Sequence, residues 1–312
     1  MVKYIAKRLV YLVLTLLIIV TTTFFLMKQL PGTPFDTERF SLLPPEQQQQ
    51  VLQKYGLDQP VLVQYGKYLF NLVRGDLGTS FFYTGRTVKD VIFGRIAPSA
   101  LIGAQAVLLG LAVGLTLGII AAWKHNTPID YFTMIVAVLG VSVPNFVVAA
   151  LLQYFVGLKW GILPVAFWKN WACSVLPSIA LSFSATAMFA RFIRTEMLDV
   201  LEQDYIVTAR AKGLSQFQVL MRHAVRNSII PVVTILGPIV VNLLTGSLAI
   251  ESIYSVPGIG SLFVESIKSN DYATIMGLTI FYSAFYIFVT LIVDVLYSVI
   301  DPRIRIQSGK ED

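Results

Sequence analysis

Residues 204–231 read DYIVTARAKGLSQFQVLMRHAVRNSIIP, a charged stretch that stands between two long apolar runs. Leading into this stretch, apolar side chains recur at every fourth position, namely Met197, Leu201, Tyr205 and Ala209. Acidic residues come early in the same segment and basic residues come late, an order that complements the helix dipole. The pattern predicts one amphipathic helix over residues 195–212. A membrane protein that keeps such a helix outside the bilayer is expected to present it to a partner.

A glycine corner is predicted to follow this helix. Gly213 suits the left-handed backbone conformation that ends many helices. Ser215 is followed three residues later by Gln218, which is the capping-box signature for the start of a helix. The sequence therefore predicts a second short helix that ends at about His223, after which the chain re-enters the membrane at Pro231.

The composition is that of a polytopic membrane protein. Of the 312 residues, 55% are hydrophobic and only 13% are charged, whereas about 25% of residues are charged in an ordinary soluble domain. The single cysteine, Cys173, excludes a disulfide within the chain, and two histidines are too few for a histidine-rich metal site. The sequence predicts no catalytic or metal site. The net charge of +6 is not arranged as a basic run interleaved with aromatic residues, so no nucleic-acid partner is expected.

Six apolar runs are long enough to cross a bilayer core, which requires about 20 residues per helix. They cover residues 9–27, 98–123, 131–158, 170–190, 227–250 and 272–293. The first run lacks a small-residue cleavage site and is interpreted as a retained signal anchor. Lys and Arg are concentrated at the N-terminus, after the second run, between the fourth and fifth runs and in the tail. This distribution predicts that both termini are cytoplasmic.

The segment between the first two runs is predicted to be a folded cap on the outer membrane surface. Pro45 can open a helix that stops at Gly56, and residues 61–73 repeat apolar side chains at helical spacing. The alternative is a solvated loop with incidental helix.

Glycines and prolines mark particular places in the apolar runs. Gly110, Gly114 and Gly118 form a small-xxx-small pattern that lets two helices approach closely, more often within one chain than between chains. Pro144 and Pro238 remove helix hydrogen bonds, and each can mark either a gating kink or simple packing.

The charged insert resembles the EAA loop found in the membrane subunits of binding-protein-dependent ABC importers. Val207, Thr208 and Ala209 stand at the E-A-A positions, and Gly213 stands at the family glycine. Downstream the chain departs from the general pattern in the manner typical of the dipeptide/oligopeptide permease branch. The residues that match this branch are Tyr205, Ala209, Ala211, Lys212, Gly213, Leu214, His223, Ala224, Asn227 and Pro231.

Further blocks along nearly the whole chain carry the same resemblance. They are residues 30–34 (LPGTP, with Thr33 where the family has Asp), 56–60 (GLDQP), 75–80 (GDLGTS), 251–260 (ESIYSVPGIG), 270–272 (NDY) and 301–305 (DPRIR). Each block is weak alone, and the assignment rests on their number and order.

The resemblance implies an all-α polytopic membrane protein with six transmembrane helices and the fold of type I ABC importer permeases. A first transmembrane helix with its cytoplasmic end (residues 1–30) would precede an extracytoplasmic loop with short helices (31–97). The core permease domain (98–312) would follow, with a cytoplasmic coupling helix in a loop at about 195–228. Such a subunit is not an enzyme and binds no cofactor, because ATP and Mg²⁺ belong to separate ATPase subunits. In agreement, the chain contains no G-x-x-x-x-G-K-[ST] phosphate loop.

The resemblance also implies partners and sites in a bacterial cytoplasmic membrane. The partners are a second homologous permease subunit in a heterodimer, two ATPase subunits, an extracytoplasmic substrate-binding protein, a peptide substrate and the lipid bilayer. The residues expected to contact the ATPase or to support that contact are Ala209, Arg210, Lys212, Gly213, Leu214, Ser215, Phe217, Leu220, Arg222 and His223. For the basic residues, the alternative is a positive-inside anchor without specific contact.

Few polar side chains occur inside the apolar runs. Asn145, Gln153 and Asn242 are the candidates for a substrate path. Asp294 near the inner end of the last run serves either transport or an ion pair at the membrane interface.

Several alternatives remain at this point. Within the family, dipeptides, glutathione or nickel chelates could replace oligopeptides as the substrate. From another class, an ion-coupled secondary transporter would work without an ATPase, but such carriers usually need intramembrane carboxylates or matching broken helices in two halves. A membrane-embedded enzyme is disfavoured because the runs contain no nucleophile–base pair and no set of metal ligands.

Overall fold

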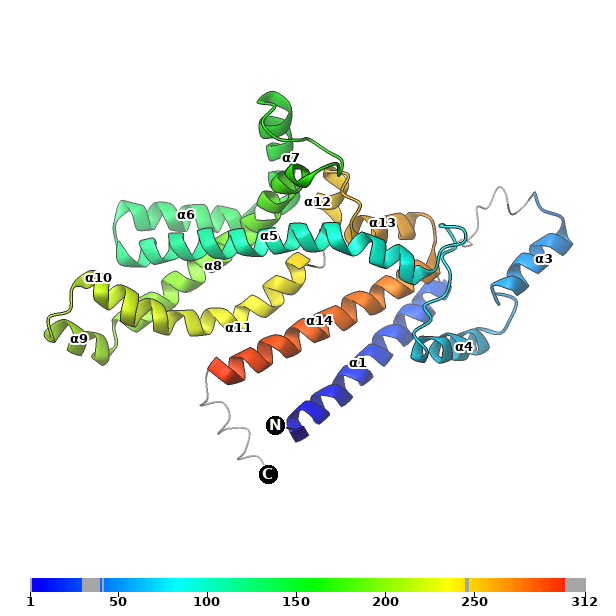
Figure 1. Ribbon diagram of the computed structural model, residues 1–312, viewed down its shortest axis with the longest axis horizontal. Coiled ribbons are helices and arrows are strands. Elements are labelled where there is room, and N and C mark those ends of the chain that lie inside the picture. The colour runs from blue at the N-terminus through cyan, green and yellow to red at the C-terminus, as the bar shows by residue number, and fades with distance from the viewer. Residues whose placement is uncertain (1, 30–39, 41, 245–246, 301–312) are drawn as a thin grey trace. The chain divides into compact units, whose positions relative to one another are not determined.

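The chain is built from helices throughout the part that the structure describes (Figure 1). The computed structural model describes residues 2–29, 40, 42–244 and 247–300. Its helices divide into two compact units, the first within residues 1–97 and 258–287 and the second within residues 98–257 and beyond 287. Of the sequence blocks that carry the resemblance, residues 30–34 and 301–305 lie outside the described part.

The first unit combines the N-terminal helix with the loop that follows it. Its helices are α1 (Val2–Gln29), α3 (Pro45–Lys54), α4 (Val61–Val73), α13 (Ile259–Lys268) and the adjoining parts of α5 (Val88–Trp123) and α14 (Tyr272–Ile300). Helices α3 and α4 have the limits that the sequence predicted, and Gly56 follows α3 with a φ of 66°. The loop therefore contains short helices, as expected.

A buried carboxylate ties the loop before α5 to the start of α14. Asp271 accepts hydrogen bonds from the Ser80 hydroxyl (2.5 Å), the Phe81 backbone N–H (3.1 Å) and the Thr274 hydroxyl (2.6 Å). Nearby, the Tyr83 hydroxyl donates to Glu265 (2.6 Å). Burial and this hydrogen bond raise the pKa of Tyr83 to about 12, so the hydroxyl remains a donor at neutral pH.

The second unit contains most of the apolar helices. After the end of α5 come α6 (Pro128–Ser142), α7 (Asn145–Leu152), the π-helical η1 (Gln153–Lys159) and the 3₁₀-helical η2 (Trp171–Ser174). They are followed by α8 (Val175–Leu201), α9 (Asp204–Ala211), α10 (Gln216–Val219), the π-helical η3 (Leu220–Ala224), α11 (Val225–Leu244) and α12 (Leu248–Ile253). The end of α14 completes the unit.

Close packing of α5 on α8 explains the repeated glycines. A Cβ added at Gly114 would lie 2.6 Å from the Thr186 carbonyl oxygen and 2.8 Å from the Phe189 Cβ. Cβ atoms added at Gly110 and Gly118 would likewise meet α8, at Ala185 and Ala190. The glycines thus allow two helices of this chain to pack closely. This confirms packing within one chain, the more frequent of the two cases expected, over packing between chains.

Within the described residues, five helices are long and apolar enough to cross a bilayer. Helix α6 with the α7–η1 segment makes a sixth span if the pair is counted as one, and the pair is bent by 101°. The bend falls at Val143 and Pro144, because proline disfavours helical geometry in the residue before it. The prediction of six apolar spans is confirmed in this sense, with the third span broken.

The limits of several spans differ from the predicted ones, and α1 (Val2–Gln29) and α14 (Tyr272–Ile300) are both longer than the predicted runs 9–27 and 272–293. Helix α5 begins at Val88 rather than at Pro98, and α8 extends to Leu201 rather than ending near Ala190. Helix α11 ends at Leu244, and α12 is a separate short helix. The predictions for α5 and α8 were short because apolar residues mark the part of a helix that lies in lipid, and these helices continue beyond it.

Candidate functional site

The segment between α8 and α11 forms a helical corner, defined here as α9, residues 212–215 and α10. Gly213 has a φ of 82°, and its N–H donates to the Arg210 carbonyl (2.9 Å). On the other side of the turn, the Ser215 hydroxyl accepts from the Gln218 N–H (3.3 Å), while the Gln218 side chain accepts from the Ser215 N–H (3.0 Å). The predicted glycine turn and capping box are both confirmed.

A small apolar core holds the two arms of the corner together. Ile206 and Ala209 of α9 and Val219 of α10 are buried against each other. Val200 and Leu201 at the end of α8 and Leu214 in the turn pack around them. This core joins both arms to the end of α8. The corner is therefore held against α8 by apolar packing in addition to the covalent connection.

The outer surface of the corner carries bare apolar side chains. Val207 is 60% exposed and Phe217 is 59% exposed, and Tyr205 is also exposed. Met221 is exposed just beyond the corner, in η3. Sequence reasoning selected Phe217 but did not include Tyr205, Val207 or Met221 among the site residues. The four-residue periodicity placed Tyr205 on the inward stripe, so the sequence carried no signal that this side chain is exposed. Exposed apolar residues gathered on a short rigid segment are characteristic of a protein contact.

The structure divides the predicted coupling residues into three groups. Arg210, Lys212, Gly213, Ser215, Phe217 and Arg222 are exposed, whereas Leu214 and His223 are half-buried. Ala209 is buried, and Leu220 is only 3% exposed. The expectation that Leu220 contacts a partner is wrong in this structure, because its side chain belongs to the core of the second unit. Ala209 supports the corner from inside.

Two predicted features of this segment are corrected. Residues 195–212 form the end of α8 and the separate helix α9, because the chain bends after Leu201. The bend shifts the inward face by one position, so Ile206 is buried and Tyr205 is exposed. Helix also continues from Gln216 to Leu244 through α10, η3 and α11, so Pro231 lies inside α11 and does not begin a span. A proline in a membrane helix removes only one backbone donor, which neighbouring groups can compensate.

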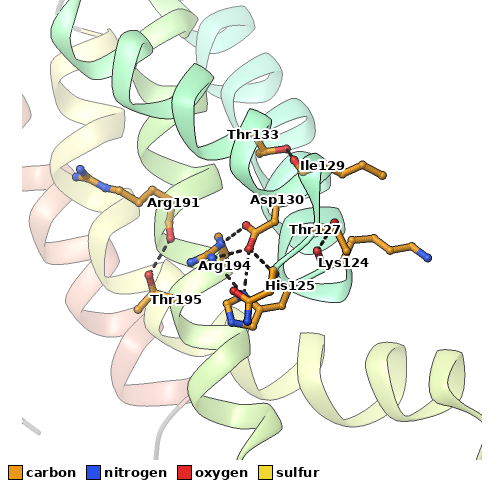
Figure 2. Close-up of polar contacts among 10 residues, drawn as sticks. Lys124, His125, Thr127, Ile129, Asp130, Thr133, Arg191, Arg194 and Thr195 are labelled. Atoms are coloured by element: carbon orange, nitrogen blue, oxygen red, sulfur yellow. Dashed lines mark hydrogen bonds and ion pairs between the residues drawn. The ribbon is translucent and has the colours of Figure 1, made fainter.

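A polar cluster at the α5–α6 turn fastens this turn to α8. Figure 2 shows the Asp130 carboxylate between the Arg194 guanidinium and the turn that carries His125. Asp130 accepts two hydrogen bonds from Arg194 (2.5 and 2.7 Å) and one from the Asn126 N–H (3.1 Å), and its Oδ2 lies 3.0 Å from His125 Nδ1. Asp130 is 1% exposed. Its position in the first turn of α6 also places its negative charge at the favourable end of the helix dipole.

Sequence reasoning missed this pair. Asp130 directly precedes the third predicted run, and Arg194 was counted only as a positive-inside residue. The partners are 64 positions apart in sequence, so no local pattern connects them. A lone carboxylate beside an apolar run was the available signal.

The α5–α6 turn also contacts the corner. The rings of Trp123, the last residue of α5, and Phe217 in α10 have centroids 6.4 Å apart. Lys124 follows Trp123 directly and begins the turn that leads to the Asp130 cluster. The turn is therefore bound to α8 through Arg194 and to α10 through Phe217.

The predicted substrate-path residues lie in different surroundings. Asn145, at the start of α7, donates to the Ser184 hydroxyl (3.1 Å). Gln153 donates to the carbonyls of Val165 (2.7 Å) and Ile253 (3.0 Å), contacts that hold the backbone in place. Asn242 is exposed and donates to the Pro238 carbonyl one turn earlier (2.9 Å). Asp294 lies in α14 where only the backbone is described.

Apolar spans joined by an exposed helical corner define a polytopic membrane protein. Comparison with protein families identifies residues 114–306 as a binding-protein-dependent transport system inner membrane component. Residues 1–97 match the N-terminal domain of the same type of component. The chain belongs to this family of importer permeases. Family membership excludes the ion-coupled transporter and the membrane enzyme considered above, and it makes the chain the non-catalytic membrane subunit.

Named relatives cover almost the whole chain. The chain is 43% identical over 306 residues to the dipeptide transport system permease protein of Lactococcus lactis subsp. cremoris (strain MG1363), covering 98% of this chain and 100% of the relative. It is also 43% identical over 309 residues to the oligopeptide transport system permease protein of Salmonella typhimurium (strain LT2), with 98% and 100% covered. One of these relatives is named for dipeptide transport and the other for oligopeptide transport.

Solved structures of ABC importers share the fold. The chain resembles a methionine ABC transporter in inward-facing conformations with a TM-score of 0.56 and 14% identity, over 68% of this chain and 97% of that one. It resembles an amino acid ABC transporter with a TM-score of 0.51 and 17% identity, over 69% and 94%. The fold predicted from the sequence resemblance is thereby confirmed.

Proposed function

We propose that this chain is the permease subunit of an ATP-driven importer that moves peptides, chiefly oligopeptides, across the cytoplasmic membrane by alternating access. Support for a peptide substrate comes from the relatives, which are named as dipeptide and oligopeptide permeases and match the chain over its length. The chain itself would carry out no covalent chemistry. A separate binding protein outside the membrane would deliver the peptide, and a second homologous permease subunit would complete the path.

The helical corner is proposed to receive the force that drives transport. The observation that carries this assignment is the set of bare apolar side chains on a segment whose backbone is fixed by Gly213, the capping box and a buried core. Two ATPase subunits would hold ATP and Mg²⁺. The corner of this chain would bind the ATPase through Val207 and Phe217. The exposed Arg210, Lys212 and Arg222 would add charged contacts at the edge.

Motion of the corner would reach the spans by two routes. One route is direct, through the core that joins α9 and α10 to the end of α8. The other passes from Phe217 to Trp123 and then through the α5–α6 turn to Asp130 and Arg194. Because both routes end on α8, we propose that α8 and the α5–α6 hairpin move together when the ATPase acts.

The proposed topology places the corner and both termini in the cytoplasm. It follows from the concentration of Lys and Arg in these segments. The loop with α3 and α4 would then face the outside. Asn145 remains the best candidate for a path residue, since its side-chain oxygen is buried without a hydrogen-bond partner among the described residues.

A cross-link tests the corner assignment. A cysteine at Phe217 is expected to form a cross-link with the ATPase subunit when a short bifunctional reagent is added to the assembled importer. A cysteine at Trp171 is the matched control, because Trp171 is an exposed aromatic residue at the opposite end of α8. The native Cys173 is buried and would be replaced by alanine. Equal cross-linking at both positions, or none at Phe217, would reject the assignment.

Uptake of peptides with defined length tests the substrate. Cells that lack the chain are expected to lose uptake of oligopeptides and to regain it when the chain is supplied. Dipeptide transport is the second candidate, because the relative from Lactococcus lactis is named as a dipeptide permease. Its sequence identity to this chain, 43%, equals that of the oligopeptide permease from Salmonella typhimurium. Recovery of dipeptide uptake alone would favour that candidate, and unchanged uptake of every peptide length would reject peptide transport.

A further inference from the structure

Helix α4 crosses α1 close to the end of its apolar stretch. The Tyr65 hydroxyl shares a hydrogen bond with the Thr21 hydroxyl (2.6 Å), and Lys28 Nζ donates to the Gln64 side chain (2.5 Å). Lys28 is the first charged residue of α1 after Arg8 and therefore marks where the apolar stretch ends. Lysine at such a position extends its amine toward the membrane surface. The contacts thus place α4 beside the last turns of the apolar stretch of α1.

One side of α4 is covered by membrane-spanning helices. Tyr65, Tyr68, Leu69 and Leu72 pack around the buried Val20 and Phe24 of α1 and Met276 of α14. The Tyr65 ring lies 5.3 Å from the Phe24 ring, and the Tyr68 ring lies 5.9 Å from it. Tyrosine is enriched where membrane meets water, because its ring is apolar and its hydroxyl is polar.

The apolar surface of α4 is wider than this contact. Leu62, Phe70 and Val73 lie on an adjoining stripe of the helix and are 72%, 57% and 88% exposed. Gly66 lies on the same stripe, since residues at spacings of three, four, seven and eleven share a face of an α-helix. The structure therefore leaves this stripe of α4 uncovered.

Basic residues border the bare stripe. Lys67 and Arg74 are exposed along its edge, and the Arg74 guanidinium lies over the Phe70 ring at 3.9 Å from the centroid. Asn71 and Gln64 lie beyond them on the polar side of the helix. An apolar stripe bordered by Lys and Arg is the arrangement found in helices that lie in the plane of a membrane surface.

We propose that α4 lies in the headgroup region of the bilayer, with Leu62, Phe70 and Val73 inserted among the acyl chains and Lys67 and Arg74 bound to lipid phosphates. Helix α1, against which α4 packs, also carries exposed apolar side chains, among them Ile18 and Leu26. Lipid in contact with α1 would therefore lie beside α4. This inference concerns membrane contact and does not depend on which substrate is carried or on which side of the membrane α4 lies.

Spin labels on adjacent faces of α4 test the proposal. Single cysteines replace Phe70 on the bare stripe and Asn71 on the polar side, both in a Cys173→Ala background. The full chain is placed in liposomes that contain phosphatidylglycerol, and each nitroxide label is exposed to oxygen, which concentrates in lipid, and to a water-soluble nickel chelate. The label at position 70 is expected to be more accessible to oxygen and less accessible to nickel than the label at position 71.

Two results would overturn the proposal. Equal nickel accessibility at positions 70 and 71 would place α4 in water. Protection of position 70 from both reagents would mean that a protein surface, such as a second permease subunit, covers the stripe. If Phe70→Cys does not insert into the membrane, Val73→Cys on the same stripe gives the same comparison with Asn71→Cys.

Discussion

Replacement of Gly213 tests whether the backbone shape of the helical corner transmits force. Gly213 has a φ of 82°, and a Cβ built there meets no atom within 4 Å. An added Cβ would therefore cause no clash, and its effect would come from backbone strain. The left-handed conformation costs a residue with a Cβ about 1–2 kcal/mol, with Asn as the usual exception because its short side chain bonds locally.

This strain is comparable with the contribution of one helix cap, which is about 0.5–2 kcal/mol. A change of about 1–2 kcal/mol alters a conformational equilibrium by a factor of roughly 5–30. The opposing stabilisation comes from one capping box and the small core of Ile206, Ala209 and Val219. Gly213→Val is therefore expected to depopulate the formed corner strongly, Gly213→Ala moderately and Gly213→Asn only slightly.

The assay is peptide uptake per ATP hydrolysed by the importer in liposomes. Gly213→Val is expected to lower this ratio while ATP hydrolysis continues, and Gly213→Asn is expected to retain most of it. Gly161→Val is the matched control, because Gly161 also has a positive φ, of 62°, and open space around it, but it lies after η1 and outside the corner. An unchanged ratio in Gly213→Val would refute the reasoning, as would an equal loss in Gly213→Asn.

Two further predictions concern stability, measured as the midpoint of thermal unfolding in detergent. Asp130→Asn leaves Arg194 without its buried charge partner, which costs about 3–5 kcal/mol. Adding Arg194→Met is expected to recover part of the loss. A double variant no more stable than Asp130→Asn alone would contradict the pairing. Gly114→Val forces α5 from α8 and is expected to lower the midpoint. Gly66→Ala enters open space inside α4 and should not lower the midpoint, because alanine forms helix better than glycine. Similar midpoints for the two variants would contradict the proposed close packing.

Features governed by local chemistry could be predicted from the sequence. The limits of α3 and α4, the left-handed Gly213 and the capping box at Ser215 all depend on residues a few positions apart. The number of apolar spans also followed, because the bilayer sets their length. These features needed no knowledge of neighbouring helices.

Features governed by packing could not be predicted in this way. The burial of Leu220 depends on contacts with other parts of the second unit, and its apolar character alone fits either a core or a partner contact. The bend between α8 and α9 changed which residues face inward, although the four-residue spacing runs across it unbroken. Periodicity identifies a stripe but does not say where the helix stops.

The sequence by itself determined the class of protein and the chemistry of the corner, because apolar length, charge order and capping residues act within a few turns of chain. The family followed from the resemblance of its sequence blocks to those of known permeases. Only the tertiary structure decided which apolar residues remain exposed for a partner or for lipid, such as Val207 in the corner and Phe70 on α4. It also decided that Asp130 meets Arg194. The physical reason is that burial and ion pairing depend on distances in space between residues far apart in sequence.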